Sequence, residues 1–308
     1  MTRRYPFSLL DLGLVAMWSS GYVGAKLAAE TQSVYLVLFW RFLLVALLLA
    51  PASIRHITMG GGVRAVWLNG VLGVCGMFMQ IGCAVVAVGM GMSAGTVSII
   101  YATQPLLTAA LADPVLGERV SRRQWIGLAI AFAGVWIASG GQSAPPLTYL
   151  LTALGTFGLV AATLIAKVTN DATPILPSIG IQSSFCAALF MLLAIADVGL
   201  RPPFQDPTFW FVVGWFIVFS TFGAFSFYWM CLRRSSAVHV GTVLYLTPVF
   251  AVAVTWLFFD EPLTLAKLCG LAICLAGAAI SLSRPIAIVP PLTVGQGLAK
   301  PLDAHDLT

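Results

Sequence analysis

The chain has 308 residues, of which 59% are hydrophobic and only 9% are Asp, Glu, Lys or Arg, and its formal net charge is +5. Soluble proteins carry charge on about a quarter of their residues, so charges this sparse could not cover the surface of a soluble fold. The composition therefore indicates an integral membrane protein, in contact with a lipid bilayer. We expect no nucleic-acid partner, because the basic residues lie in short loops between apolar runs, where membrane topology accounts for them.

Ten apolar runs follow one another along the chain, separated by turn-forming groups such as Gly60-Gly61-Gly62 and Pro145-Pro146. A helix needs about 20 apolar residues to cross the hydrocarbon core of a bilayer, and each run is close to that length. The predicted spans are residues 9–28, 34–52, 65–88, 93–112, 124–140, 147–166, 175–196, 209–231, 238–258 and 265–283. The first run lacks a small-residue cleavage site, so we interpret it as a membrane helix and not as a signal peptide.

One stretch of the chain occurs twice, at a constant offset in residue number. Between residues 93 and 137, 13 of 45 ungapped positions are identical to their counterparts in the stretch 236–280. The paired residues include Pro105 with Pro248, Glu118 with Glu261, Gly127 with Gly270, and Gly134 with Gly277. A period of about half the chain indicates a duplicated domain. We expect one repeat at residues 1–143, a second at 144–284, and a disordered cytoplasmic tail at 285–308.

Lys and Arg residues are distributed unequally between the two sides. If the N-terminus lies in the cytoplasm, twelve fall in cytoplasmic segments and three, Lys26, Arg201 and Lys267, in outer ones. Because short cytoplasmic loops carry the excess of Lys and Arg, we expect both termini in the cytoplasm and the chain in the cell inner membrane. Each repeat has five spans, an odd number, so the second repeat must be inverted in the bilayer. Inverted repeats are typical of secondary transporters, whose substrate sites lie near the midplane between the halves.

Motifs in the first two spans, together with the doubled block, resemble one family. Residues 18–26 (WSSGYVGAK) resemble its Trp-to-Lys opening, and residues 39–42 (FWRF) resemble its Phe-x-Arg-Phe signature. Over about residues 9–283 the chain is similar to the EamA family of the drug/metabolite transporter superfamily. The resemblance implies ten helices, cytoplasmic ends, and export or exchange of amino acids and other small metabolites. It also implies that the fifth and tenth spans lie at the periphery, where they could support a homodimer.

The second repeat departs from the first in ways that bear on the site. It has Asp260-Glu261-Pro262 where the first has Gly117-Glu118-Arg119, and no Trp precedes Lys167, the rough counterpart of Lys26. We therefore expect an asymmetric site. The fold class predicted is an all-α membrane protein, with ten transmembrane helices in two five-helix inverted-topology repeats.

Pro105 and Pro248 lie within their predicted spans, where each removes a backbone donor. Two interpretations stand: an ordinary kink of a membrane helix, or a hinge in a broken helix that faces a central cavity. The identical placement in both copies favours the hinge. Glu118 and Glu261 precede a helical run by a few residues, so we expect them to hold a loop to a neighbouring backbone rather than to bind cargo.

Polar and aromatic residues deep in the spans are the candidates for contact with cargo. Arg41 is too deep to reach the interface easily, so it either binds or gates the substrate or anchors the fold, with Glu30 or a substrate carboxylate as its partner. An unpaired buried Gln amide is costly and needs a ligand or another helix. The predicted substrate-binding residues are Trp18, Tyr22, Arg41, Gln80, Tyr101, Gln104, Tyr228 and Tyr245; Thr163, Gln182 and His239 are further candidates.

No predicted span has a carboxylate near its centre. Exporters of cations usually need such a deep acid, so the sequence favours a neutral, zwitterionic or anionic solute. A broad exporter of drugs or toxic metabolites, and a membrane sensor that transports nothing, are the alternatives. The chain has no His-Glu-x-x-His, P-loop or Gly-x-Ser-x-Gly motif, so we expect no metal, no cofactor and no enzymatic activity.

Overall fold

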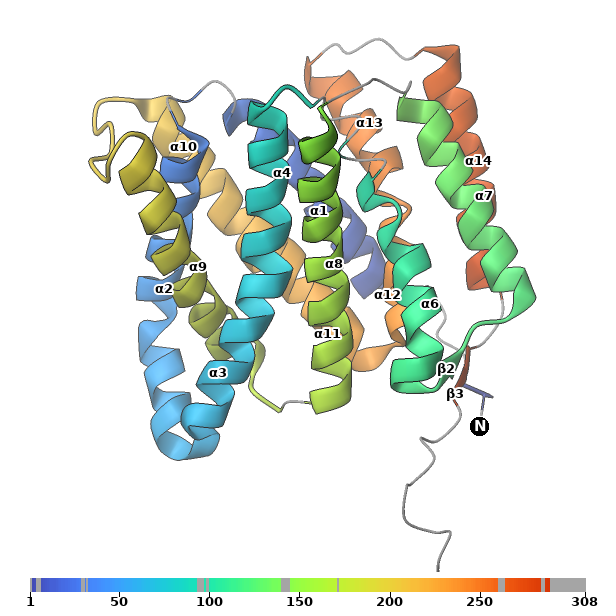
Figure 1. Cartoon of the computed structure of the whole chain (residues 1–308), viewed down its shortest axis with the longest axis horizontal. Helices are drawn as coiled ribbons and strands as arrows, with labels where there is room; N and C mark the ends of the chain where they lie inside the picture. The colour runs from blue at the N-terminus through green and yellow to red at the C-terminus, as the bar shows by residue number, and fades with distance from the viewer. Residues whose placement is uncertain are drawn as a thin grey trace, which may run out of the picture.

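The protein is a bundle of helices, most of which run side by side (Figure 1). The computed structural model describes residues 2–3, 7–28, 31, 33–92, 97, 100–139, 145–170, 172–259, 264–283 and 286–288.

The first half of the chain forms helices that follow the predicted spans. They are α1 (Leu9–Ala28), α2 (Val34–His56), α3 (Gly62–Gly73), α4 (Gln80–Gly89), α6 (Gln104–Leu116) and α7 (Arg122–Ser139). The π-helical segment η1 (Ile57–Gly61) joins α2 to α3, and the π-helical segment η2 (Val74–Met79) joins α3 to α4. The third predicted span is thus one helical run, whereas part of the fourth lies outside the described residues.

The second half repeats this order. It contains α8 (Pro146–Thr169), α9 (Ile175–Asp197), α10 (Pro207–Trp215), η3 (Phe216–Phe225, π-helical), α11 (Ser226–Arg234), α12 (Ala237–Leu244), α13 (Thr247–Phe259) and α14 (Leu265–Leu282). Because the repeat offset places η2 within η3, the π-helical distortion is present in both halves. Ser33, Asp206, Ser236 and Thr264 cap helix N-termini through side-chain oxygens.

Five helical stretches are long and apolar enough to cross a membrane, by length and composition, within the described residues. They are Val34–Ala84, Pro146–Thr169, Ile175–Asp197, Pro207–Arg234 and Leu265–Leu282, with shorter apolar helices at Leu9–Gly21 and Ala237–Phe250. Large apolar side chains such as Leu47, Leu48, Trp136 and Leu257 are exposed on the outside of the bundle. A helical bundle with this apolar exterior is a membrane protein, as the composition predicted.

Helices α7 and α14 show that the two copies run in opposite directions. A Cβ placed on Gly127 would lie 2.7 Å from the Gly277 carbonyl oxygen, and one on Gly134 would lie 2.5 Å from that of Gly270. As the residue number rises along α7 it falls along α14, so the helices are antiparallel, side by side in Figure 1. Exchanging each residue for its counterpart in the other copy turns the Gly127–Gly277 contact into the Gly270–Gly134 contact, which is the behaviour of a local two-fold axis. The repeat is therefore inverted.

Three short strands bring the two ends of the chain together. Strand β3 (Ile286–Ile288) pairs antiparallel with β1 (Thr2–Arg3) on one side and with β2 (Glu118–Arg119) on the other. Both terminal segments therefore lie at the same end of the bundle (Figure 1). The segment expected to be a disordered tail begins with this strand, and residues beyond 288 lie outside the described part.

Candidate functional site

The fourth and ninth predicted spans are interrupted at matching points. Helices α6 and α13 begin at Gln104 and Thr247, which are counterparts in the repeat, and each has proline as its second residue. The preceding two residues form turns, in which the Thr103 amide donates to the Ile100 carbonyl (3.0 Å) and the Tyr245 amide to the Thr242 carbonyl (3.1 Å). Proline fits the first turn of a helix because its missing N–H would have no partner there. Both halves therefore contain a discontinuous helix at the position of the proline.

The two discontinuous helices meet across the interface between the repeats. A Cβ placed on Gly241 of α12 would lie 3.3 Å from the Cα of Pro105. Glycine at this position lets the backbones approach closely, because an added Cβ would be in tight contact with Pro105. The break in the first half thus packs directly on the helix that precedes the break in the second half.

A group of polar and aromatic side chains surrounds Tyr228. Its hydroxyl shares a short hydrogen bond with Thr163 Oγ1, and the side-chain amide of Gln104 lies beside it. The Trp18 ring lies 5.3 Å from the Tyr228 ring and 5.4 Å from the Phe225 ring, measured between centroids. We call Trp18, Gln104, Thr163, Phe225 and Tyr228 the Tyr228 cluster. It draws α1 and α6 from the first half and α8, η3 and α11 from the second.

Gln80 and Tyr101 form a neighbouring pair. The Tyr101 hydroxyl donates to the Gln80 carbonyl oxygen and lies against α8, where a Cβ on Gly155 would be 3.0 Å away. Gln80 is 9% exposed, and its Oε1 has no hydrogen-bond partner within the described part of the chain. Since a buried acceptor without a partner costs about 1–3 kcal/mol, this atom is available to a polar ligand.

Arg41 is the most deeply buried cation of the described residues, with 1% exposure. Its Nε donates to Thr221 Oγ1 (2.8 Å) and its Nη2 to Ser220 Oγ (2.9 Å), both in the π-helical segment η3. Its guanidinium carbon lies 4.6 Å from the Phe42 ring centroid and 4.9 Å from that of Phe216. Among the described residues no carboxylate lies within salt-bridge distance, and Glu30 is outside them. Hydroxyls and aromatic faces thus solvate this charge without neutralising it.

Other predicted residues lie elsewhere. Tyr245 is buried on the side of α14, in a hydrophobic group with Ala109 and Val135, so it does not join the Tyr228 cluster. Its hydroxyl has no partner among the described residues. The side chain of Tyr22 lies outside the described part. Tyr245 and the Tyr228 cluster therefore lie in separate groups of the bundle.

His239 and Gln182 each enter a separate polar group. His239 Nε2 lies 3.3 Å from Asp11 Oδ1, with 5% and 4% of the two side chains exposed. Gln182 Nε2 donates to Ser178 Oγ (2.8 Å), and Ser178 Oγ in turn donates to Asn69 Oδ1. The sequence predicts Asp11 at a helix end, and neither Asn69 nor Ser178 is among the predicted site residues. Their polar character within apolar runs was the available signal.

Glu118 holds two halves of the protein together, as expected for a structural loop acid. Its Oε1 accepts from the Ala237 amide (3.2 Å) and its Oε2 from the Val238 amide (3.4 Å), at the N-terminus of α12. A carboxylate is favoured there by the free amides and the helix dipole. Burial raises the pKa of this carboxyl above its ordinary value, although the two amide bonds and the charge of Lys167 oppose the shift. Glu261, its counterpart, is outside the described residues.

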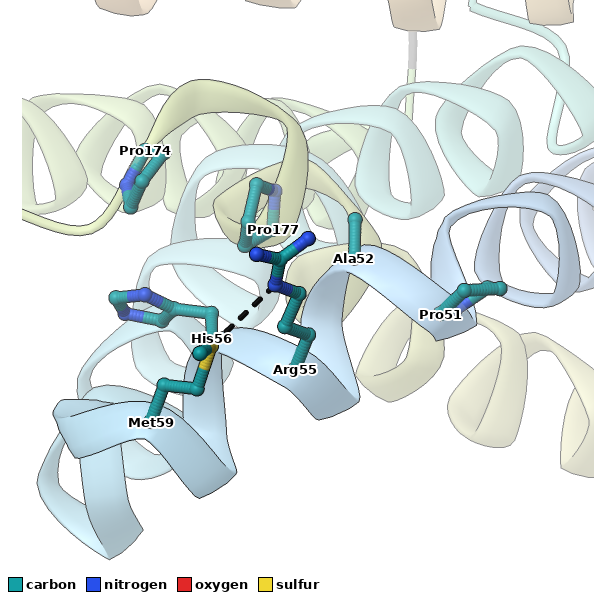
Figure 2. A pocket seen from close by; sticks show the side chains of 7 residues that line it. All are labelled: Pro51, Ala52, Arg55, His56, Met59, Pro174 and Pro177. Atoms are coloured by element: carbon teal, nitrogen blue, oxygen red, sulfur yellow. Dashed lines mark hydrogen bonds between the residues drawn. The ribbon is translucent and has the colours of Figure 1, made fainter.

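A depression of about 470 Å³ lies at one end of the bundle, between α2, η1 and the start of α9. Figure 2 shows Arg55 in it, with Nε 3.3 Å from the sulfur of Met59 and with Pro177 behind. The predicted substrate-binding residues do not line this depression.

Comparison with known proteins identifies the fold and its family. The EamA-like transporter family matches this chain twice, at residues 7–140 and 146–283. The chain belongs to the EamA-like transporter family. The double match reflects the duplicated repeat, and membership makes the protein a membrane transporter.

Named relatives match most of the length of this EamA-like transporter at low identity. It is 25% identical over 298 residues to a probable amino-acid metabolite efflux pump of Salmonella typhimurium, covering 91% of this chain and 95% of the relative. It is 23% identical over 246 residues to the uncharacterized inner membrane transporter YedA of Escherichia coli, covering 78% of each. A solved crystal structure superposes with a TM-score of 0.73 at 18% identity, over 91% of this chain and 98% of that one, which shows the fold alone.

Proposed function

We propose that this EamA-like protein exports or exchanges small neutral or zwitterionic metabolites, amino acids foremost, across the cell inner membrane by alternating access. The observation that carries the proposal is the composition of the Tyr228 cluster. Helices of the first half and helical runs of the second together supply its hydroxyl, amide and indole groups. A solute held there would touch both halves at once, so its binding would depend on their relative position. The name of the Salmonella relative supports the choice of amino acids.

Movement between the halves is proposed to centre on the two interrupted helices. Residues 1–143 and 144–284 would rock against each other, with the turns before Pro105 and Pro248 as hinges. The cluster residues contact one another directly and are largely buried; Tyr228 is 0% and Gln104 6% exposed. A solute would therefore reach them only when the halves separate. Loss of flux in a variant whose turn at residues 102–103 is stiffened, with the fold retained, would support this role.

Arg41 is proposed to act on the carboxylate of the solute. Its charge is buried with hydroxyl and aromatic partners, and a carboxylate is the group that would neutralise it best. The rival role, anchoring α2 to η3, predicts that its replacement lowers stability without changing which solutes are carried.

The direct test is flux in reconstituted vesicles with a panel of labelled amino acids, and with ethidium as a cationic drug. We expect flux of at least one neutral amino acid and a marked loss in the Tyr228→Phe protein. The matched control is Tyr149→Phe, which alters a partly exposed tyrosine on the outside of α8. Flux of ethidium with none of any amino acid would establish the drug exporter instead, and no flux of any solute would favour the sensor.

Topology is tested separately by single cysteines at Ser121 and Thr264, in a protein whose six native cysteines are replaced. These positions are counterparts in the repeat and precede α7 and α14. We expect an impermeant thiol reagent to reach Ser121→Cys only from the cytoplasm and Thr264→Cys only from outside. Labelling of both from one side would contradict the proposed arrangement in the membrane.

A further inference from the structure

A small cleft with a volume of about 60 Å³ lies between helices of both halves. Its lining includes Asn69 of α3, Ser178 of α9 and Trp229 of α11, which are 1%, 4% and 4% exposed, while Lys167 of α8 and Arg233 of α11 lie where it opens to the surface. We call it the Lys167 cleft. A water needs about 10–15 Å³ of such volume, so the cleft has room for a carboxylate or an ammonium group with its first carbon.

Two buried polar atoms at this cleft lack partners in the described part of the chain. They are Nε1 of Trp229, a donor, and Oε1 of Gln182, an acceptor. Trp229 lines the cleft itself, and Gln182, which is 0% exposed, hydrogen-bonds the lining residue Ser178. Buried polar atoms are nearly always paired in folded proteins, so the unpaired donor of Trp229, which lines the cleft, points to a ligand that supplies an acceptor.

The mouth of the cleft is cationic. Lys167 Nζ donates to the Ser235 carbonyl and Arg233 Nη2 to the Thr173 carbonyl, so both side chains are held in place by main chain. Glu118 offsets part of the Lys167 charge. Lys167 and Arg233 both line the cleft with cationic hydrogen-bond donors, which suit the oxygen atoms of an anionic group.

The corresponding place at the opposite end of the bundle is filled. By the repeat offset, Leu72 and Gly73 correspond to Trp215 and Phe216, which pack against Gly24 of α1. A Cβ on Gly24 would lie 2.7 Å from the Phe216 ring and 3.1 Å from the Trp215 ring. The indole N–H of Trp215, unlike that of Trp229, is satisfied by the Ser20 carbonyl (3.1 Å). The two halves thus make an open cleft on one side of the membrane and a packed aromatic plug on the other.

We propose that the Lys167 cleft is a second binding site, which takes the carboxylate of a small zwitterionic solute before it reaches the centre of the bundle. Lys167, Arg233 and the Trp229 N–H, all of which line the cleft, receive the carboxylate. The Trp229 ring packs edge-on against Tyr228, at 5.1 Å between centroids, so the cleft adjoins the Tyr228 cluster. The identity of the solute rests on the proposed function, whereas the affinity for a carboxylate does not.

The test uses the indole N–H resonances of the full-length protein, labelled with ¹⁵N-tryptophan in phosphatidylcholine nanodiscs. The signals lost in Trp229→Phe and in Trp215→Phe assign the two indoles, and both variants keep an aromatic ring. Acetate, L-leucine and isopentylamine, which is leucine without its carboxylate, are the probes. We expect acetate and leucine to shift the Trp229 signal saturably and isopentylamine to leave it in place, with Trp215 unmoved throughout.

Lys167→Gln should weaken the acetate response at least several-fold, and Lys267→Gln, a control in the first turn of α14 at the other end of the bundle, should not. The proposal is overturned if Trp229 fails to shift before Trp215 does, or if isopentylamine acts as acetate does. A shift that needs phosphatidylglycerol in the nanodisc and ignores acetate would assign the cleft to a lipid headgroup and also overturn it. Because acetate binding is read without transport, a protein that moves no amino acid but responds to acetate would refute the proposed function and leave the cleft standing.

Discussion

The α7–α14 contact keeps the two-fold symmetry of the internal duplication, whereas the Tyr228 cluster does not. Across α7–α14 the two copies pack the same glycines against each other, and each of these glycine contacts has a counterpart related by the local two-fold axis. In the Tyr228 cluster the counterparts differ: Gln104 corresponds to Thr247, and no tryptophan precedes Lys167 as Trp18 precedes Lys26. Close helix packing needs the same small residues on both sides, whereas a site for one asymmetric solute gains nothing from symmetry. Residues that are the same in both copies therefore build the scaffold, and we expect residues that differ between the copies to recognise the solute.

The largest effect should come from filling the symmetric contact. Gly134→Ala and Gly270→Ala each place a Cβ within 2.6 Å of an opposing carbonyl oxygen. Overpacking typically costs about 1–3 kcal/mol, and the two-fold relation predicts similar losses for both, seen as lowered thermal unfolding temperatures in detergent. Gly214→Ala is the control, because no atom lies within 4 Å of the added carbon. Unequal losses at Gly134 and Gly270 would break the symmetry argument.

Replacement of Arg41 by Gln should be the next largest effect and should depend on the solute. A hydrogen bond to a charged group is worth about 1.5–3 kcal/mol. The leucine concentration that gives half-maximal flux should therefore rise roughly tenfold or more. Flux of isopentylamine, if measurable, should change little. Arg201→Gln, at an exposed loop, serves as the control. An equal loss for both solutes together with a lower unfolding temperature would mean that Arg41 only anchors the fold.

Replacement of Gln104 should have a smaller effect on transport, and replacement of its counterpart Thr247 should have none. Gln104 lies beside Tyr228, where its amide can hydrogen-bond a solute, whereas Thr247 Oγ1 donates to the Leu244 carbonyl at the end of α12 (2.7 Å). A neutral hydrogen bond contributes about 0.5–1.5 kcal/mol. Gln104→Leu should therefore raise half-saturation for leucine roughly several-fold, and Thr247→Val should leave it unchanged. Equal responses in vesicle flux would show that recognition is as symmetric as the packing.

The smallest effect should be a change in pH dependence on replacing Glu118. Because burial raises the pKa of this carboxyl, the protonated form stabilises the fold, and that contribution is lost as pH rises from the ordinary carboxyl value through the raised one. Glu118→Gln cannot ionise, so the wild-type unfolding temperature should fall relative to the variant across this window. Asp206→Asn, at the N-cap of α10, is the control. Parallel profiles for wild type and Glu118→Gln would contradict the prediction.

The site was harder to predict than the fold, and Tyr245 and Tyr228 show why. Both are buried tyrosines in the second half, and both were predicted to bind cargo. Tyr228 meets Trp18, Thr163 and Gln104, whereas Tyr245 points toward α14. One residue along a helix turns a side chain by about 100°, so an uncertainty of one or two residues in helix rotation decides which neighbours it meets.

The sequence by itself determined the membrane class, the helical spans, the inverted duplication and the breaks at Pro105 and Pro248. Those features follow from local properties, namely the length of apolar runs, the missing amide of proline, and a repeat with an odd number of spans. Only the tertiary structure decided that Gly127 meets Gly277, that Arg41 is held by Ser220 and Thr221, and that the Lys167 cleft is open while its counterpart is filled by Trp215 and Phe216. Such contacts depend on how distant helices are rotated and spaced against one another, which the close packing of the whole bundle sets.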